Sequence, residues 1–319
     1  MGSGLEMSHT VHSSMRAPDD PQMLRQLVDE LANFEDIAKS LIPQPGDLPR
    51  LHGIDVCGKT LALNGMVGGD HIIYVDFKQR FDLEARIARA IEQNRGEVAQ
   101  QLRRCQRTAG IAVVDVAGHR MTDALLAAML HQAFLLGAIY ELDMFGGITK
   151  RLFENLNTRF YQSSGSHKFI SLIYGEISED ARFRFLSAAH PFPTIFSRRH
   201  DRFMEVGPDL RVSFPPLGMQ PSLHGIDRGI VEASSLGFKD RYETNEWWLM
   251  GQGDILLLHT DGFSDHHVGD QMYFPSRLER SLREVKHLSA REIYEAIKKD
   301  LVAFAEPSDD VSLVVIKRN

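Results

Sequence analysis

Five acidic residues at the ends of apolar runs are the side chains in this sequence best placed to do chemistry. Asp70 precedes one such run, Asp115 ends another, Asp261 follows a third, and Asp309-Asp310 precede a fourth. Strands at these runs would hold the carboxylates at an edge of a sheet while the core fixes their backbone. Two carboxylates about 4 Å apart repel by roughly 4 kcal/mol at an effective dielectric constant near 20, so such a cluster must bind cations or take up protons.

The ligands that these residues offer are oxygen atoms, which suit hard divalent ions such as Mg²⁺ or Mn²⁺. Two such ions about 3.5–4 Å apart can activate a water molecule against a phosphoryl group. Glycines stand beside the acidic residues: Gly68-Gly69 would let the backbone approach a ligand closely, and Gly118 and Gly262 follow their aspartates at expected sharp turns. We therefore expect two divalent cations, Mn²⁺ or Mg²⁺, as cofactors.

Apolar β-branched runs and helical periods indicate the elements that must position these residues. Strands are expected at 72–77, 111–116, 169–177, 183–188, 247–259 and 311–317. Helices are expected at about 82–107, 121–142, 145–161, 276–286 and 290–305, with Met121, Leu125, Ala128 and Met129 in the core. Because strands and helices do not alternate regularly, the sequence favours α+β layers over a Rossmann sheet.

Five motifs occur in the order found in PPM (protein phosphatase 2C-like) serine/threonine phosphatases. They are Val67-Gly-Gly-Asp70, Asp115-Val-Ala-Gly-His119, Ala188-Ala-His190-Pro-Phe-Pro193, Leu-His-Thr-Asp261-Gly262 and Asp309-Asp310-Val-Ser312. Over about 67–317 the chain most resembles the bacterial SpoIIE/RsbU branch of that family. The resemblance implies PPM-type α-β-β-α layers, that is, a central antiparallel β-sandwich flanked by helices, with the metal centre at one end.

The resemblance also implies a role for each acidic residue. Asp115 would bridge both ions, and the backbone carbonyl of Val116 would add a ligand. No residue would act as a covalent nucleophile, because a metal-activated water would attack a phosphoserine or phosphothreonine, often in an anti-sigma-factor antagonist of the STAS fold. The implied metal ligands are Asp70, Asp115, Val116, Asp261 and Asp309, with Asp310 as the alternative to Asp309, and the implied catalytic residues are Asp115 and Asp261.

The chain departs from the family pattern at several positions. Ile73 stands where relatives usually carry an aspartate, and Arg120 stands where a glycine is expected; Asp123, Ala189 and Asp265 are further departures. None of them removes an implied ligand. The loss of a carboxylate at position 73, together with Arg120, keeps open an alternative function: a catalytically weak or inactive regulatory module that binds a phosphoprotein.

The sequence divides into three parts. Residues 1–19 are expected to be a disordered tail or an expression remnant, 20–45 an N-terminal regulatory or linker helix, and 46–319 a phosphatase domain. Apolar residues of the helix repeat in heptads from Leu24 to Leu41, so it either docks on its own domain or forms a homodimer through 20–42. The domain carries a helical insertion at about 78–107 with eight Lys/Arg against four Asp/Glu. That insertion is either half-buried or a helix that docks substrate or gates the site.

A second motif competes with this interpretation. Residues 53–60 match the P-loop pattern G-x-x-x-x-G-K-[ST], which would indicate an ATPase. A P-loop needs an apolar strand before it and a helix after it, whereas a turn-rich segment precedes this match and glycines follow it. Ile54 and Val56 alternate as in a strand, so the ATPase is the less favoured alternative.

Composition narrows the classes further. The 36 Lys and Arg against 43 Asp and Glu give a net charge of −7, which argues against a nucleic-acid binder. No uninterrupted run of eighteen apolar residues occurs, so no membrane span is expected. The two cysteines, Cys57 and Cys105, form no CxxC motif, which disfavours a thiol redox site or a cysteine zinc site. We expect a cytoplasmic protein.

Overall fold

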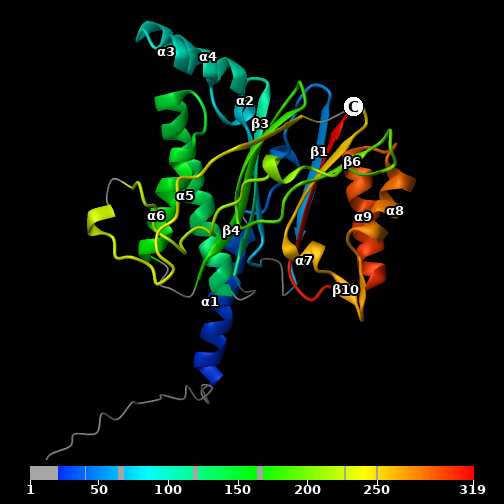
Figure 1. Ribbon diagram of the computed structural model, residues 1–319. Helices are drawn as coiled ribbons and strands as arrows, with labels where there is room; N and C mark the ends of the chain where they lie inside the picture. The colour runs from blue at the N-terminus through cyan, green and yellow to red at the C-terminus, as the bar shows by residue number, and fades with distance from the viewer. Residues whose placement is uncertain are drawn as a thin grey trace, which may run out of the picture.

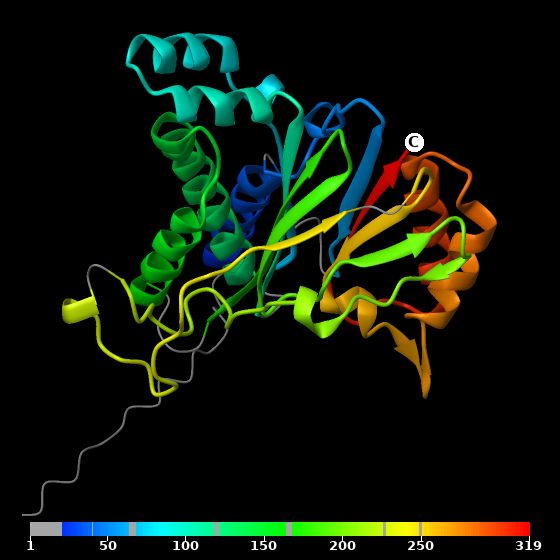
Figure 2. The ribbon, with the colours of Figure 1, turned by 45° about the horizontal axis from the view of Figure 1, so that its top comes forward.

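Two five-stranded antiparallel sheets face each other, and helices cover their outer faces (Figure 1). The computed structural model describes residues 21–39, 41–63, 68–117, 121–163, 168–225, 228–248 and 251–319. The expected α-β-β-α layering is confirmed, since helix pairs lie on both sides of the sandwich (Figure 2).

The strands of each sheet come from both halves of the chain. The first sheet has the order β1 (Ile54–Leu61), β12 (Val311–Arg318), β9 (Ile255–His259), β6 (Thr194–Ser197) and β7 (Arg202–Phe203). The second has the order β2 (His71–Asp76), β3 (Thr108–Val116), β4 (Ile170–Ser178), β5 (Arg182–Ala188) and β8 (Asn245–Trp248). A short hairpin, β10 (His267–Val268) with β11 (Gln271–Met272), stands apart.

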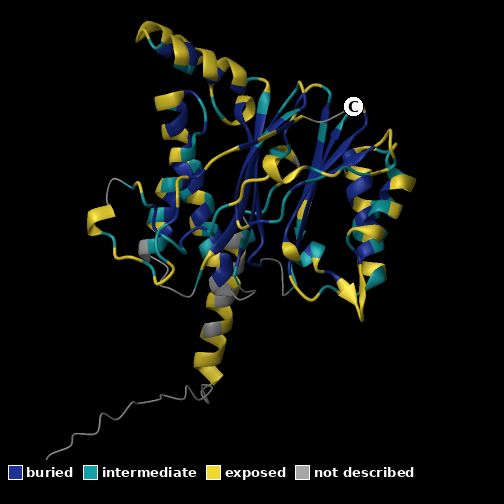
Figure 3. Cartoon of the chain, viewed as in Figure 1, coloured by how far each residue is buried: buried dark blue, intermediate teal, exposed yellow. Residues whose placement is uncertain are grey.

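The helices cover the two outer faces. On the second sheet lie α5 (Met121–Phe145) and α6 (Lys150–Ser163), and on the first lie α8 (Ser276–Val285) and α9 (Ala290–Phe304). Shorter elements are α2 (Phe77–Arg80), α3 (Leu83–Glu92), α4 (Gly96–Cys105), α7 (Asp261–Ser264) and the 3-10 turns Pro45–Asp47, Pro208–Leu210 and Arg228–Ile230. Helix α1 (Pro21–Lys39) contacts α5 and extends beyond the body of the molecule, where it is largely exposed (Figure 3).

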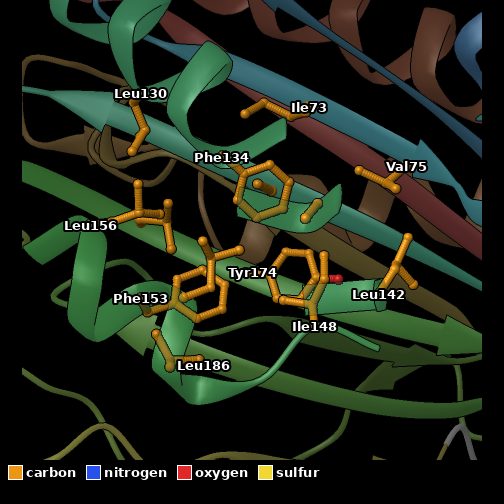
Figure 4. Close-up of a cluster of buried hydrophobic side chains, with 14 of the residues drawn as sticks. Ile73, Val75, Leu130, Phe134, Leu142, Ile148, Phe153, Leu156, Tyr174 and Leu186 are labelled. Carbon is orange, nitrogen blue, oxygen red and sulfur yellow. The ribbon is translucent and has the colours of Figure 1, made fainter. Parts of the chain in front are cut away.

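Side chains that alternate in direction along each strand let one sheet contribute to two hydrophobic clusters, one on each of its faces. In β3, Ile111 and Val113 pack between the sheets, whereas Ala112 and Val114 pack toward the helices. The cluster on the helical side joins side chains of α5, α6 and the second sheet (Figure 4). A third cluster lies between the first sheet and α8–α9. Strands buried on both faces are nearly continuous in apolar residues, which is the pattern that identified them in the sequence.

Three elements differ from the sequence prediction: one strand and one helix are each divided in two, and a second helix begins later than expected. The single strand expected at 247–259 is two strands, β8 and β9, which belong to different sheets; Gly253, with φ of 84°, lies in the turn before β9. The helix expected at 82–107 is a hairpin of α3 and α4, because Asn94 has a left-handed φ of 55°. The helix expected from 145 begins at Lys150, after Gly146 with φ of 76°. In each case the chain makes a local backbone turn, which the periodicity of apolar residues does not predict.

The basic insertion lies away from the acidic residues. Helices α2, α3 and α4 join the end of β2 to the start of β3, whereas Asp70 and Asp115 lie at the other end of these strands. Six residues of strand separate the two ends by about 20 Å. Leu83, Ile87 and Leu102 bury one side of the hairpin. This placement fits a half-buried insertion and not a gate over the acidic residues.

Helix α5 is more apolar on its surface than expected. Leu125 and Met129, predicted as core, are 48% and 47% exposed, so that prediction is wrong. By length and composition, Asp123–Phe145 could cross a membrane, although scattered polar residues keep it from being an uninterrupted apolar run. Core helices pass the same test, and Phe134 and Leu142 of α5 are fully buried against the sheet. One side of α5 thus packs on the sheet as a core helix does.

Candidate metal centre

The register of the two sheets brings the predicted acidic residues to one end of the sandwich. His71 at the start of β2 pairs with Val114 near the end of β3, so Asp70 and Asp115 are neighbours in the second sheet. In the first sheet, the end of β9 pairs with the start of β12 through His259 and Leu313. The residues that flank this pair are Asp261, which begins α7, and Asp309 and Asp310, which precede β12.

A buried threonine ties the two sheets together at this end. The Thr260 hydroxyl donates to Asp70 Oδ2 at 2.6 Å and accepts from the backbone N–H of Ser312 at 3.0 Å. Thr260 is fully buried. One side chain thus links the start of β2, the end of β9 and the start of β12. Thr260 stands within one of the five sequence motifs, but the motif gave no indication of this role.

Asp309 and Asp310 differ in their surroundings. Asp310 is buried and accepts backbone N–H groups of Leu63 and Gly69, each at 2.7 Å, through its two oxygens. Its carboxylate therefore anchors the segment that precedes Asp70. Asp309 is exposed, and its charge acts on both Asp115 and Asp261.

Two glycines permit this close packing. A Cβ at Gly68 would overlap the Asp310 carboxylate, and a Cβ at Gly262 would overlap the backbone oxygen of Asp310. The sequence predicted a close approach at Gly68 and a sharp turn at Gly262, and in the structure Asp310 is the residue that approaches both glycines.

Burial and mutual repulsion dominate the electrostatics of the cluster. Burial, followed by the charges of Asp261 and Asp309, raises the pKa of Asp115 to about 7. Burial and the charge of Asp115 raise the pKa of Asp70 well above its usual range. Burial likewise raises the pKa of Asp261, with Asp309 adding to the shift. No Lys, Arg or His side chain is among the groups that shift the pKa values of Asp70, Asp115 and Asp261. The acidic side chains therefore lie together without a basic side chain that offsets their charge.

Oxygen donors of this kind fit hard divalent cations. In the described part of the chain, no three His, Cys, Asp or Glu side chains stand in a ready-made metal-binding group. Ionised carboxylates that lie near one another repel, and a divalent cation bound by them would remove that repulsion. Val116 is the last residue of β3, and its backbone N–H donates to Gly69 at 3.3 Å, which keeps it beside the Asp70 segment.

A serine and a histidine form a hydrogen-bonded chain that ends on Asp115. Ser171 lies opposite Asp115 in the β3–β4 register, and its hydroxyl donates to Asp115 Oδ2 at 3.4 Å. The same hydroxyl lies 2.9 Å from His190 Nδ1. Burial lowers the pKa of His190 to about 3, so this ring is neutral and orients Ser171. Ser171 was not among the residues predicted from the sequence, since only the strand register reveals it.

We expect Ser171→Ala to weaken divalent-cation binding about 10–100-fold, because supporting hydrogen bonds orient metal ligands. Calorimetric titration of the purified protein with Mn²⁺ measures the affinity. Ser197→Ala, at a buried serine of β6 away from the acidic residues, is the matched control and should bind as the wild type does. Equal affinities for the wild type and Ser171→Ala would contradict the role.

The raised pKa of Asp115 predicts how metal-free stability depends on pH. Between the ordinary aspartate pKa near 4 and about 7, the folded state holds a proton on Asp115 that the unfolded chain releases. The free energy of unfolding should therefore fall as pH rises through this window. Thermal melting in chelator should show a midpoint several degrees lower at pH 8 than at pH 5.5, and Asp115→Asn should flatten that difference. The prediction would be wrong if the melting temperature of the wild type rose with pH and that of Asp115→Asn changed with pH to the same extent.

Other sequence-predicted features lie elsewhere. Residues 54–60 of the P-loop match lie in strand β1, which pairs with β12, so the match forms no phosphate-binding loop. Ile73 is buried in the core on the helical side of the second sheet. His119 and Arg120 lie outside the described residues.

A family model described as Stage II sporulation protein E (SpoIIE) matches residues 106–319. No curated protein matches the chain. Among solved structures, the SiaA-PP2C domain of Pseudomonas aeruginosa is similar with a TM-score of 0.60 at 16% identity, over 93% of this chain and 99% of that one.

Two larger structures share the fold. The RsbU and RsbW domains of a Mycobacterium tuberculosis protein give a TM-score of 0.56 at 17% identity, over 85% of this chain and 61% of that one. The PP2C phosphatase domain of Bacillus subtilis SpoIIE with a fragment of its regulatory domain gives 0.54 at 16% identity, over 84% and 64%. The chain thus spans less than two thirds of either structure. At these identities the likeness establishes the fold.

Proposed function

The chain belongs to the SpoIIE family of PP2C-type phosphatase domains, and on this basis we propose that it hydrolyses phosphoserine or phosphothreonine in a protein. The observation that carries the proposal is the acidic cluster at one end of the sandwich, where Asp70, Asp115 and Asp261 all have raised pKa values. The cluster has the donor chemistry for Mn²⁺ or Mg²⁺.

The mechanism assigns each residue a task. Two divalent cations, when bound, would supply Lewis acidity and a water activated for in-line attack on the phosphoryl group. Asp115, held by Ser171, would hold both ions, and Asp70 and Asp261 would contribute further carboxylate ligands. We assign the remaining ligand to Asp309, because Asp310 already accepts backbone N–H groups through both oxygens. The carbonyl of Val116 would complete the set.

The substrate we propose is a phosphorylated anti-sigma-factor antagonist of the STAS fold. This rests on the family and on similarity to an RsbU domain, a branch whose members often act on such proteins. We also propose a cytoplasmic location, in keeping with two buried cysteines that are both free thiols.

Phosphate release tests the activity directly. The 319-residue chain should hydrolyse a generic aryl phosphate when Mn²⁺ is added, and hydrolysis should stop when a chelator removes the metal. A phosphoprotein-binding module would bind a phosphopeptide without turnover. Ile73 favours that second candidate, because it places an isoleucine where relatives usually have a carboxylate. Metal-independent turnover, or binding without turnover, would overturn the phosphatase proposal.

Helix α1 supports a homodimer through 20–42. Leu24 and Val28 are 54% and 55% exposed on a helix that extends from the domain. Because exposed apolar side chains on such a helix favour association, Leu24→Glu with Val28→Glu should halve the mass measured by light scattering. Val302→Glu, at an exposed apolar residue of α9, is the control and should leave the mass unchanged. An identical mass for the double variant and the wild type would remove the idea.

A further inference from the structure

A half-buried lysine near the end of β3 has no task in the mechanism proposed above. Lys168 stands two residues before β4, and its side chain is 32% exposed. The ammonium group of Lys168 donates to the backbone oxygen of Ala117 at 3.0 Å and forms an ion pair with Asp123. Ala117 follows Val116, the last residue of β3, and Asp123 lies in the first turn of α5. One side chain thus joins the end of β3, the start of β4 and the N-terminus of α5.

Both backbone groups of Ala117 are held by the segment that leads into β4. The N–H of Ala117 donates to the backbone oxygen of Phe169 at 3.1 Å, and the oxygen of Ala117 accepts from Lys168. A trans peptide points its N–H and its C=O in opposite directions, so the carbonyl of Val116, which shares a peptide with the N–H of Ala117, points away from β4. The N–H of Val116, which in a strand points to the same side as its carbonyl, donates to Gly69 at 3.3 Å. The carbonyl of Val116 therefore faces the segment before β2, which carries one of the proposed metal ligands.

Asp123 supplies the counter-charge that this lysine needs. The side chain of Asp123 is fully buried, and a negative charge is favoured in the first turn of a helix. An unpaired ammonium group near the acidic cluster would repel divalent cations, whereas an ammonium group paired with a carboxylate adds a hydrogen-bond donor with little net charge. Asp123 is one of the positions at which the chain departs from the family pattern, so the resemblance does not lead us to expect this ion pair.

We propose that Lys168 is a positioning residue for the metal centre. This role rests on the proposed function, in which the carbonyl of Val116 is one of the metal ligands. Because β3 ends at Val116, the orientation of this carbonyl depends on the contacts of Ala117, and Lys168 supplies one of them. A ligand that is held in the binding direction before the cation arrives loses less conformational freedom on binding. Lys168 acts through Ala117 and does not itself bind the cation.

The binding of Mn²⁺ tests this role. Removal of the lysine alone would leave the buried carboxylate of Asp123 without its partner and would destabilise the fold. The test therefore combines Lys168→Met with Asp123→Asn, which removes both charges and nearly preserves both shapes. The metal-free 319-residue chain is titrated with Mn²⁺ by calorimetry. We expect the double variant to bind Mn²⁺ about tenfold more weakly than the wild type, because supporting contacts of metal ligands are typically worth about 10–100-fold in affinity.

The matched control is Lys286→Met combined with Asp201→Asn. Lys286 and Asp201 also form an ion pair, and the side chain of Lys286 is 25% exposed. Asp201 lies in the turn between β6 and β7, at the end of the sandwich away from the acidic cluster. This control removes the same two charges and should bind Mn²⁺ as the wild type does.

Hydrogen–deuterium exchange in chelator separates positioning from a general loss of stability. The amide of Ala117 should exchange faster in the Lys168→Met/Asp123→Asn variant than in the wild type, because its peptide is held less firmly. The amides from Ile111 to Val114, in the middle of β3, should exchange at the wild-type rate. A residue that only stabilises the fold would change exchange throughout the sheet and leave the affinity for Mn²⁺ unchanged.

Each outcome supports or overturns the positioning role. Weaker Mn²⁺ binding together with faster exchange confined to the end of β3 supports it. Equal Mn²⁺ affinities for a wild type that binds and for the double variant would overturn the role and leave the proposed function intact. A wild type that binds no Mn²⁺ would overturn the proposed function, and the role of Lys168 with it.

Discussion

Asp115→Asn should lower Mn²⁺-dependent phosphate release by about a thousandfold or more, because Asp115 is the residue proposed to hold both ions, and stabilisation of the transition state by metal ions is worth several kcal/mol. The substitution keeps the shape of the side chain and removes the charge. It also removes repulsion with Asp261 and Asp309, the charges that help to raise the pKa of Asp115. The metal-free variant should therefore melt at a higher temperature than the wild type, although we expect it to release almost no phosphate.

This pair of opposite effects distinguishes a ligand from a structural residue. A structural aspartate would lose activity and stability together. Asp270→Asn, at an exposed aspartate between β10 and β11, changes the same charge outside the cluster and should alter neither quantity. Wild-type turnover by Asp115→Asn would refute the assignment. Steady-state rates over a range of Mn²⁺ concentrations and melting in chelator provide the two measurements.

Gly262→Ala should remove most activity by displacing the backbone rather than a ligand. The added methyl would overlap the backbone oxygen of Asp310, which cannot rotate away as a side chain can. Overpacking of this kind costs about 1–3 kcal/mol of stability. A displacement of about 1 Å at the ligand-bearing segments lowers the rate about 100-fold. Denaturant unfolding and Mn²⁺-dependent turnover measure the two effects.

The control for this glycine is Gly207→Ala. Gly207 has φ of −59°, and nothing lies within 4 Å of a Cβ placed there. That substitution should leave stability and turnover close to those of the wild type. If Gly262→Ala matched Gly207→Ala in both measurements, the close approach of α7 to Asp310 would be shown to matter for neither stability nor turnover.

Local pattern in the amino-acid sequence was enough to locate most of the candidate site. Acidic residues at the ends of apolar runs, with glycines beside them, pointed to Asp70, Asp115, Asp261 and the pair Asp309-Asp310, and did not distinguish between the two members of that pair. Apolar runs also located most strands, because a strand buried on both faces must be almost wholly apolar. Local turns were harder to predict, as the division of 247–259 between two sheets demonstrates.

The contacts across the sandwich could be found only in the folded molecule. Thr260 reaches Asp70 from 190 positions away, and Asp310 accepts the N–H of Gly69 from 241 positions away. Ser171 supports Asp115 only because β3 and β4 adopt one particular register. Pairing between distant segments depends on the packing of the whole core, and local sequence pattern contains no record of it.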